Sequence, residues 1–291
     1  MRLTITYEHE IAINAFEWIP ASYKQALHMH SSLEIGLCLS GNGYFYFGDK
    51  TFEVVAGDLF IVNNEELHIA ESPPDHPSRY LFLNFDPDLL LAEDPGLLLP
   101  FSYRSPQFRN LIAADSDIAA SIRPWMHAIA DELRSKQPGY LAMAKSGLIQ
   151  LCGLLLRHYH AQSTEAEQLA MIQSVRQARA LAEWVERHYR EPIGLQAIAD
   201  KLNISLSRAS RVFLETTGKR FTDYVNLLRI REAKRLLAGS AKSAADIGFD
   251  CGFQSMATFY RVFKESTGLS PAAYRKNLGL PAKNENSMPP T

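Results

Sequence analysis

The chain has 291 residues, 46% of them hydrophobic and 21% charged, and a formal net charge of −2. This composition is ordinary for a soluble globular protein, and the length allows two domains with separate cores. No run of about 18 apolar residues occurs, so we expect no membrane span. The N-terminus lacks an apolar segment typical of a secretory signal, and the three cysteines form no CxxC pair. Both features favour a reducing cytoplasm over a disulfide framework or a zinc ribbon.

The charge is divided unevenly along the chain. Residues 1–170 contain 11 Lys and Arg against 21 Asp and Glu, a balance of −10, whereas residues 171–291 contain 19 against 11, a balance of +8. Such segregation favours two domains with different partners, and a basic half favours a polyanion as one of them. The alternative is that surface charge varies along the chain without reflecting different partners.

The first ninety residues have the pattern of β-strands. The segment from Glu34 to Val62 is rich in β-branched and aromatic residues and is interrupted by Gly-containing turns at 41–43 and 48–49. Residues 78–85 predict another strand. This part of the chain therefore predicts an all-β domain.

From about residue 107 the periodicity changes to that of helices. Apolar residues recur at three- to four-residue spacing, first at Phe108, Leu111 and Ile112 and then, after a short break, from Ile118 to Leu133. A second helix is predicted from about 140 to 159. Two such helices would cover the β domain or pack against a second chain. The expected organisation is a β domain with two following helices at 1–160, a linker at 161–171, a helical domain at 172–280 and a disordered tail at 281–291.

Two segments fifty residues apart, 205–218 and 255–268, are near-copies, with seven of fourteen aligned residues identical. On a helix of about 100° per residue, each copy has an apolar face and an outward polar face. A serine precedes each helix as a candidate N-cap, and a glycine follows it. The inward residues are Ala209, Val212, Phe213 and Thr216, then Phe259, Val262, Phe263 and Ser266; the outward residues are Ser207, Ser210, Arg211 and Leu214, then Ala257, Tyr260, Arg261 and Lys264.

A shorter helix and a tight turn precede each copy. Asn203 and Gly252 occupy the turns, since both residue types tolerate positive φ, and the small Ala199 and Gly248 let the two helices cross closely. Helix, short turn and a second helix with a polar outer face form the helix-turn-helix pattern. The predicted units span 195–217 and 244–267.

A helix from Thr222 to Ala238 is predicted between the two units. At about 1.5 Å per residue it would be about 25 Å long, which together with flanking turns suits successive major grooves about 34 Å apart. One chain would then contact two neighbouring major-groove segments. A helical repeat that packs only on itself is the alternative.

The second copy and the connecting helix together carry a longer pattern of residues. Its members are Ile247, Gly252, Phe253, Ser255, Phe259, Arg261, Phe263, Lys264, Gly268, Ser270, Pro271, Tyr274 and Arg275, with Tyr224, Arg229, Ala233, Leu236 and Leu237 in the connecting helix. This pattern resembles that of the AraC/XylS family of bacterial transcription regulators, over about residues 175–276. Leu214 and Ala209 depart from that family's pattern, since Lys and a larger apolar residue are usual at these positions.

The resemblance implies double-stranded DNA as a partner, a small-molecule effector such as a sugar, a homodimer formed through the helices at about 107–160, and RNA polymerase. It also implies activation of transcription rather than catalysis. Arg donates two hydrogen bonds to guanine, and Ala contacts the thymine methyl group. The implied base contacts are Ser207, Ser210, Arg211, Ala257, Tyr260 and Arg261, and the implied phosphate contacts are Arg208, Lys219, Arg220, Thr258 and Lys264.

A histidine-rich pattern lies in the β domain. His28, His30 and Glu34, with Gly41, Gly57 and His68 at the expected spacing, resemble the two motifs of cupins, which are small β-barrels that can enclose a ligand. In metal-binding cupins the three histidines and the glutamate coordinate a divalent metal. Asn63, Glu65 and Ser72 depart from the second motif.

Three interpretations of these histidines stay open: an effector pocket without a metal, a structural or surface role, and a metal site. We predict the first, with His28, His30, Glu34 and His68 in the pocket and with no metal or cofactor. We expect Cys38 to belong to the core.

The sequence therefore predicts a cytoplasmic, effector-controlled transcription regulator with an N-terminal cupin-like barrel, two following helices and an all-α tandem helix-turn-helix domain. One alternative is a metal-dependent cupin enzyme, a dioxygenase or isomerase, with a helical appendage. Another is a DNA binder without sequence preference.

Overall fold

A computed structural model describes residues 1–278, apart from 4, 10, 64, 65, 103–107 and 218. The chain divides into two compact units, and the main division falls between Arg179 and Ala180. The predicted disordered tail, 281–291, and the predicted capping residue Gly218 lie outside the described residues. Among the described helices, none is long and apolar enough to cross a membrane.

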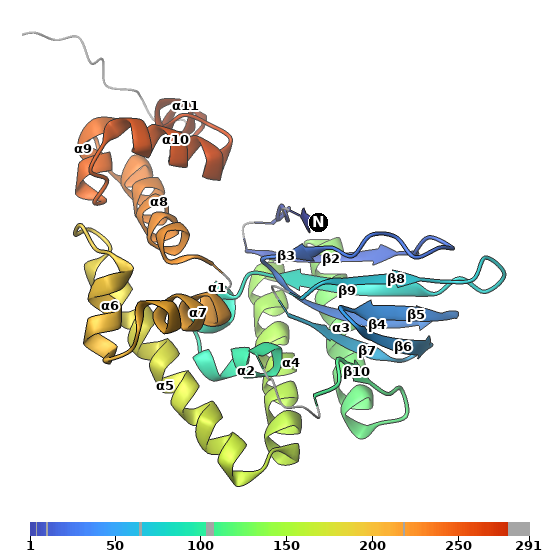
Figure 1. Cartoon of the computed structure of the whole chain (residues 1–291). Helices are drawn as coiled ribbons and strands as arrows, with labels where there is room; N and C mark the ends of the chain where they lie inside the picture. The colour runs from blue at the N-terminus through green and yellow to red at the C-terminus, as the bar shows by residue number, and fades with distance from the viewer. Residues whose placement is uncertain (4, 10, 64–65, 103–107, 218, 279–291) are drawn as a thin grey trace, which may run out of the picture. The chain divides into compact units, whose positions relative to one another are not determined.

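The first unit is built on β-sheets (Figure 1). The largest sheet is antiparallel in the order β10-β7-β4-β9-β2 and contains β2 (Ile13–Trp18), β4 (Leu33–Ser40), β7 (Leu59–Val62), β9 (Arg79–Phe85) and β10 (Leu111–Ile112). A three-stranded sheet in the order β6-β5-β8 contains β5 (Asn42–Phe47), β6 (Lys50–Val55) and β8 (His68–Glu71). Strand β1 (Arg2–Leu3) pairs in parallel with β3 (Met29–His30).

An aromatic core fills the space between the two larger sheets. In β5 alternate side chains are buried, so Phe45 and Phe47 point into the core. Phe45 stacks on Phe60 of β7, with ring centroids 4.5 Å apart, and Tyr80 of β9 contacts both rings. Cys38 is also buried in this cluster, which confirms the prediction that it is a core residue.

The predicted cupin-like barrel is not closed. In the described residues no continuous ladder of strand pairs joins the five-stranded sheet to the three-stranded one. A barrel requires that ladder to run all the way round, whereas here two facing layers bury their side chains against each other. The two-domain layout, with a β-rich first domain and a helical second domain, is confirmed.

Three longer helices follow the sheets: α3 (Asp117–Ser135), α4 (Tyr140–Gln162) and α5 (Glu165–His188). Helices α3 and α4 pack side by side, and α3 also contacts β2 and β9 (Figure 1). The two predicted helices are therefore present. Shorter turns precede them at α1 (Asp88–Leu91), η1 (Pro95–Leu98) and α2 (Leu99–Ser102).

The predicted start of the first long helix is wrong. Leu111 and Ile112 form β10 and pair with β7, and the helix begins only after Ser116. The Ser116 hydroxyl accepts a hydrogen bond from the Ala119 N–H, which caps the helix. Asn110 donates to the Ile61 carbonyl and helps to hold the preceding residues at the sheet edge.

The segment 161–171, predicted as a linker, is mostly helical. Its non-helical part is Ser163–Thr164, between α4 and α5. Thr164 and Glu167 form a capping box, because the Thr164 hydroxyl accepts from the Glu167 N–H at 3.3 Å and the Glu167 carboxylate accepts from the Thr164 N–H at 2.8 Å. This cap begins α5 in the middle of the polar segment.

The second unit contains the two predicted helix-turn-helix units. Ser266 is exposed rather than inward, and it lies in the last turn of α10, which ends at Thr267. The side chain of Thr216 lies outside the described residues. The helices are α6 (Leu195–Leu202), α7 (Leu206–Thr217), α8 (Phe221–Gly239), α9 (Ala244–Asp250), α10 (Met256–Thr267) and α11 (Pro271–Asn277).

Local chemistry explains why these helices begin and end where they do. Asn203 and Gly252 have φ of 52° and 93°, as predicted for the turns. A Cβ on Gly248 would lie 2.3 Å from the Met256 methyl group and 2.8 Å from the buried Phe259 ring, so the absence of a side chain lets α9 and α10 cross closely. Ser255 accepts a hydrogen bond from the Thr258 N–H, and Gly268 ends α10 with φ of 73°.

Candidate nucleic-acid interface and ligand cavity

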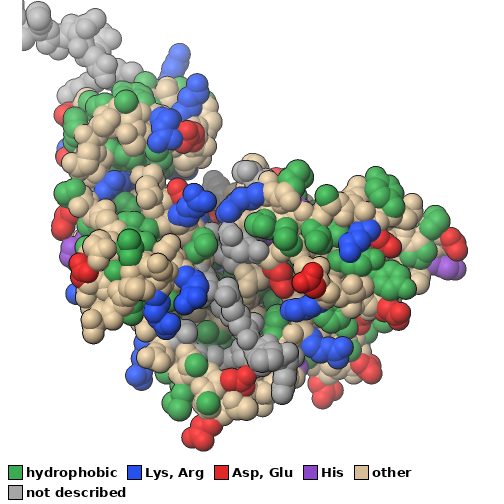
Figure 2. All heavy atoms as spheres, in the orientation of Figure 1, with side chains coloured by type: hydrophobic (Ala, Val, Ile, Leu, Met, Phe, Trp, Pro, Cys, Tyr) green, Lys and Arg blue, Asp and Glu red, His purple; other side chains and the backbone are tan. Residues whose placement is uncertain are grey.

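The second helix of each helix-turn-helix unit presents a polar face to solvent. All six predicted base-contacting residues are exposed, while Phe213 in α7 and Phe259 and Phe263 in α10 anchor these helices in their cores. Figure 2 shows Lys and Arg side chains on the surface of the helical unit. The exposed set is Ser207, Ser210 and Arg211 on α7, with Ala257, Tyr260 and Arg261 on α10.

Arg261 is held by its own helix. Its guanidinium donates to both carboxylate oxygens of Glu265 at 2.9 and 3.0 Å, and both side chains are about 60% exposed. An exposed pair of this spacing stabilises a helix by only about 0.2–0.5 kcal/mol. Glu265 therefore aligns the arginine without preventing its guanidinium from binding another acceptor.

The predicted phosphate-contacting residues differ in exposure. Arg208, Arg220, Thr258 and Lys264 are exposed, whereas Lys219 is half-buried. Arg208 and Thr258 each donate their backbone N–H to the capping serine ahead of their helix, Ser205 or Ser255. Four of the five residues are thus accessible to a polyanion.

Helix α8, which connects the two helix-turn-helix units, is held by hydrogen bonds to the residues that follow α5. The Arg229 guanidinium donates to the carbonyl oxygens of Tyr189 and Glu191 at 2.7 and 2.9 Å. Arg190 pairs with Glu232 at 2.7 Å. At 19 residues α8 is about 28 Å long. These contacts hold α8 against the residues that follow α5.

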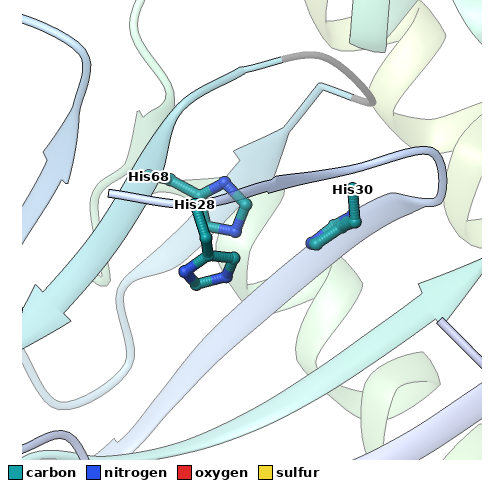
Figure 3. A group of neighbouring side chains, drawn as sticks. All are labelled: His28, His30 and His68. Atoms are coloured by element: carbon teal, nitrogen blue, oxygen red, sulfur yellow. The ribbon is translucent and has the colours of Figure 1, made fainter. Parts of the chain in front are cut away.

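The four predicted pocket residues lie together in the first unit. His28, His30 and His68 point toward one another (Figure 3), with ring centroids 4.4 to 6.0 Å apart. Strand pairing explains this arrangement, because His28 and His68 exchange backbone hydrogen bonds at 3.1 and 2.8 Å. Glu34, from the adjacent β4, lies 3.4 Å from His30 Nε2 and 3.8 Å from His68 Nε2.

Hydrogen bonds at Nδ1 orient both buried histidines. Nδ1 of His68 donates to the Glu66 carbonyl at 2.8 Å, so this ring carries its hydrogen on Nδ1. Nδ1 of His30 lies 2.9 Å from both the carbonyl and the hydroxyl of Ser32, so it either donates to the carbonyl or accepts from the hydroxyl. Nε2 of each ring faces Glu34.

The cluster places one carboxylate among three imidazoles, and burial and neighbouring groups shift their pKa values in different directions. Burial lowers the pKa of His28 to about 4, and it also lowers the pKa of His68. Burial alone would raise the pKa of Glu34, but its contacts with His30 and the charges of the two buried histidines lower it overall. Burial likewise opposes protonation of His30, yet the neighbouring Glu34 carboxylate raises its pKa.

A cavity of about 520 Å³ opens onto this cluster. Its walls are mainly apolar, with the polar groups gathered at the histidines, which is the usual character of a small-molecule site. Asn84 donates to Glu34 at the polar end. Trp18 and Phe16 lie against Phe82 on the wall formed by β2 and β9.

Comparison with known proteins places both units in one family. A family model described as an AraC-like ligand binding domain matches residues 10–152, and one described as a helix-turn-helix domain matches residues 198–277. The chain belongs to the AraC family of transcription regulators. Its first unit is the ligand-binding domain of this regulator, and its second is the DNA-binding domain.

Relatives match the AraC-family regulator along most of its length. The HTH-type transcriptional activator RhaR of Pectobacterium atrosepticum is 27% identical over 255 residues, 86% of each chain. The HTH-type transcriptional regulator YdeC of Bacillus subtilis is 24% identical over 253 residues, again 86% of each chain. The solved DNA-binding domain of the transcriptional factor AdpA, in complex with a target DNA, is 28% identical and covers 34% of this chain and 90% of its own, with a TM-score of 0.33.

Sequence reasoning missed most of the regulator's cavity wall. Asn84 is a polar residue among the buried apolar residues at the end of β9, and such a residue is a signal for a buried hydrogen bond. The residues from β1 and β2 carry no comparable signal, because apolar side chains there predict only core. The missed lining residues are Met1, Leu3, Ile5, Phe16, Trp18, Gln25, Ala26, Phe45, Ile69, Ala70, Phe82 and Asn84.

Proposed function

We propose that this AraC-family regulator binds a specific operator sequence through α7 and α10 and responds to a small molecule held in the cavity at His28, His30, Glu34 and His68. The observation that carries the proposal is the pair of helix-turn-helix units, each with a buried apolar face and an exposed arginine, Arg211 or Arg261. In this proposal Ser207, Ser210, Ala257 and Tyr260 complete the base contacts.

The proposed effector acts by changing the coupling between the two units. Such coupling typically amounts to about 1–3 kcal/mol. We further propose that the protein is a transcriptional activator, as the name of the RhaR relatives describes for those proteins, and that it acts together with RNA polymerase. It would act as a cytoplasmic homodimer assembled through α3 and α4, where Met143 is 58% exposed, and not as an enzyme.

The remaining proposed DNA contacts position the protein on the duplex. Arg208, Arg220, Thr258 and Lys264 flank the base-contacting faces, and Lys219 joins them from the segment ahead of α8. Contacts to phosphate set the register of a protein on DNA without distinguishing sequence, and they make affinity depend on salt. Replacement of one of these residues should therefore lower affinity for all duplexes alike.

Selection of binding sites from a pool of random duplexes tests the proposal. The purified chain should enrich one motif, and affinity for that motif should exceed affinity for a shuffled duplex by at least about 1,000-fold at physiological salt. Equal affinity for both duplexes would instead identify a binder without sequence preference. Turnover of an organic substrate by the purified protein would favour the cupin enzyme.

A further inference from the structure

Two hydrogen-bond acceptors lie side by side at the polar end of the cavity. Nδ1 of His68 donates to the Glu66 carbonyl, so Nε2 of the neutral ring carries a lone pair, and burial favours that neutral ring by lowering its pKa. This Nε2 is buried without a hydrogen-bond partner among the described residues, and it lies 3.8 Å from Oε1 of the Glu34 carboxylate. A carboxylate oxygen also only accepts. Buried polar atoms are normally satisfied, so this pair calls for a donor between the two atoms.

The neighbouring side chains direct their donors elsewhere. Asn84 donates to the second oxygen of the carboxylate, Oε2. Nε2 of His30 also faces Oε2, at 3.4 Å, and it can donate there when Nδ1 accepts from the Ser32 hydroxyl. The ring of His28 lies 4.4 Å from that of His68 and lines the cavity (Figure 3), but it leaves the His68 Nε2 without a partner. The missing donor must therefore come from a bound molecule.

The charges at the cavity wall indicate the sign of that molecule. Of the described residues that line the cavity, none is Lys or Arg, and Glu34 is the only one with a carboxylate. The Met1 ammonium, also at the wall, already donates to the Leu27 carbonyl at 2.9 Å. The Glu34 side chain is only 7% exposed, so its charge is weakly screened by water. The polar end therefore attracts a cation and repels an anion.

We propose that the effector is a small organic amine, bound as its primary ammonium ion between His68 and Glu34. The binding site stands on its own geometry, whereas the role of the amine as effector rests on the proposed function. An ammonium group has three hydrogens and can donate to both acceptors at once, while a hydroxyl has only one hydrogen. Two acceptors 3.8 Å apart can both lie about 2.9 Å from one nitrogen atom.

The rest of the cavity defines the body of the amine. The volume of about 520 Å³ is in the range of sites for small organic ligands. Phe16 and Trp18 lie against Phe82, with ring centroids 5.7 and 6.0 Å from the Phe82 ring, and all three rings line the cavity. These rings suit an aromatic or alkyl body. A sugar has hydroxyls on all sides, and those facing the rings would lose water without gaining a hydrogen bond.

Calorimetric titration of the full chain at pH 7 tests this assignment with four ligands that share one phenethyl skeleton. EDTA is present so that no metal ion mediates binding. Phenethylamine should bind saturably, with one molecule per chain. Phenethyl alcohol, which is neutral, and hydrocinnamate, which is anionic, should each bind at least about 10-fold more weakly, because hydrogen bonds to a charged group are the stronger ones. Phenethyltrimethylammonium keeps the charge but has no N–H, and it should also bind more weakly.

A pair of variants locates the ammonium. Glu34→Gln keeps the shape of the side chain and removes its charge, so it should weaken phenethylamine binding at least about 10-fold and change binding of the alcohol far less. Glu53→Gln is the matched control, because Glu53 is exposed on β6 and is not among the residues that line the cavity. It should leave the affinity for phenethylamine unchanged. If circular dichroism shows that Glu34→Gln is unfolded, the order of the four ligands on the wild-type protein decides.

Absence of saturable phenethylamine binding overturns the amine site, as does equal affinity for the amine, the alcohol and hydrocinnamate. Equal binding of the trimethylated ion overturns the hydrogen-bonded ammonium. Operator affinity measured with phenethylamine and with a panel of neutral monosaccharides separates this site from the proposed function. A sugar that changes operator affinity in a chain that binds no amine refutes the amine and leaves the proposed function intact. Amine binding that leaves operator affinity unchanged supports the site and refutes its role in regulation.

Discussion

Replacement of Arg261 by Ala separates DNA recognition from stability. In the structure the guanidinium contacts only Glu265 among the described residues, in an exposed pair one helical turn along α10. Loss of such a pair should change the free energy of unfolding by less than about 0.5 kcal/mol. A guanidinium that binds guanine O6 and N7 contributes about 1–3 kcal/mol of discrimination. Arg261→Ala should therefore weaken operator binding about 5- to 150-fold without destabilising the fold.

Arg187→Ala provides the matched control. Arg187 forms a comparable exposed pair with Glu183 on α5, and its removal lowers the net charge by the same amount. Fluorescence anisotropy with the selected operator and with a shuffled duplex, at one salt concentration, measures both variants. If Arg261→Ala weakens binding to both duplexes equally, the residue contacts phosphate. If it behaves like Arg187→Ala, α10 does not contact the bases and the docking geometry is wrong.

Three further predictions follow from local geometry. Gly252→Ala should destabilise the second helix-turn-helix unit by more than about 1 kcal/mol, because φ is 93° and the new Cβ would lie 2.5 Å from the Arg190 carbonyl oxygen. Chemical denaturation measures this, and an unchanged midpoint would contradict it. Ser255→Ala removes the N-cap of α10 and should lower stability by about 1 kcal/mol, whereas Ser266→Ala, at an exposed site, should have little effect. Burial raises the pKa of Cys38 and Cys251 to about 11 and also raises that of Cys152. At pH 8 a thiol reagent should therefore label none of the three cysteines in the native protein and all three after unfolding. Rapid labelling of the native protein would contradict this and show that the cores open.

The sequence predicted the helical unit well because its signals are local. Capping serines, positive-φ residues at Asn203 and Gly252, and apolar spacing within a single helix all depend on neighbouring residues, so they appear in the sequence directly. The same signals failed at Leu111 and Ile112, whose helix-like spacing is outweighed by pairing with β7. That pairing joins residues about fifty positions apart, and no local pattern reports it.

The two candidate sites also differ in how far local sequence predicts them. The polar faces of α7 and α10 follow from helical periodicity, so their exposure was predictable residue by residue. The histidine cluster was predictable as a motif, but the orientation of its rings depends on hydrogen bonds to Ser32 and Glu66, and the size of the cavity depends on walls contributed by β1, β2 and β9. Long-range packing sets those features. It also leaves the sheets as two facing layers instead of a closed barrel.

Methylation interference on the selected operator tests the central claim most directly, because it reports contacts to guanine N7 in the major groove. Two recognition helices joined by a spacer of about 28 Å should produce two interference clusters about one helical turn, or roughly 10 base pairs, apart on one face of the duplex. Arg261→Ala should remove one cluster and leave the other. A single cluster that persists in this variant, or interference spread evenly along the duplex, would contradict recognition by two helices of one chain.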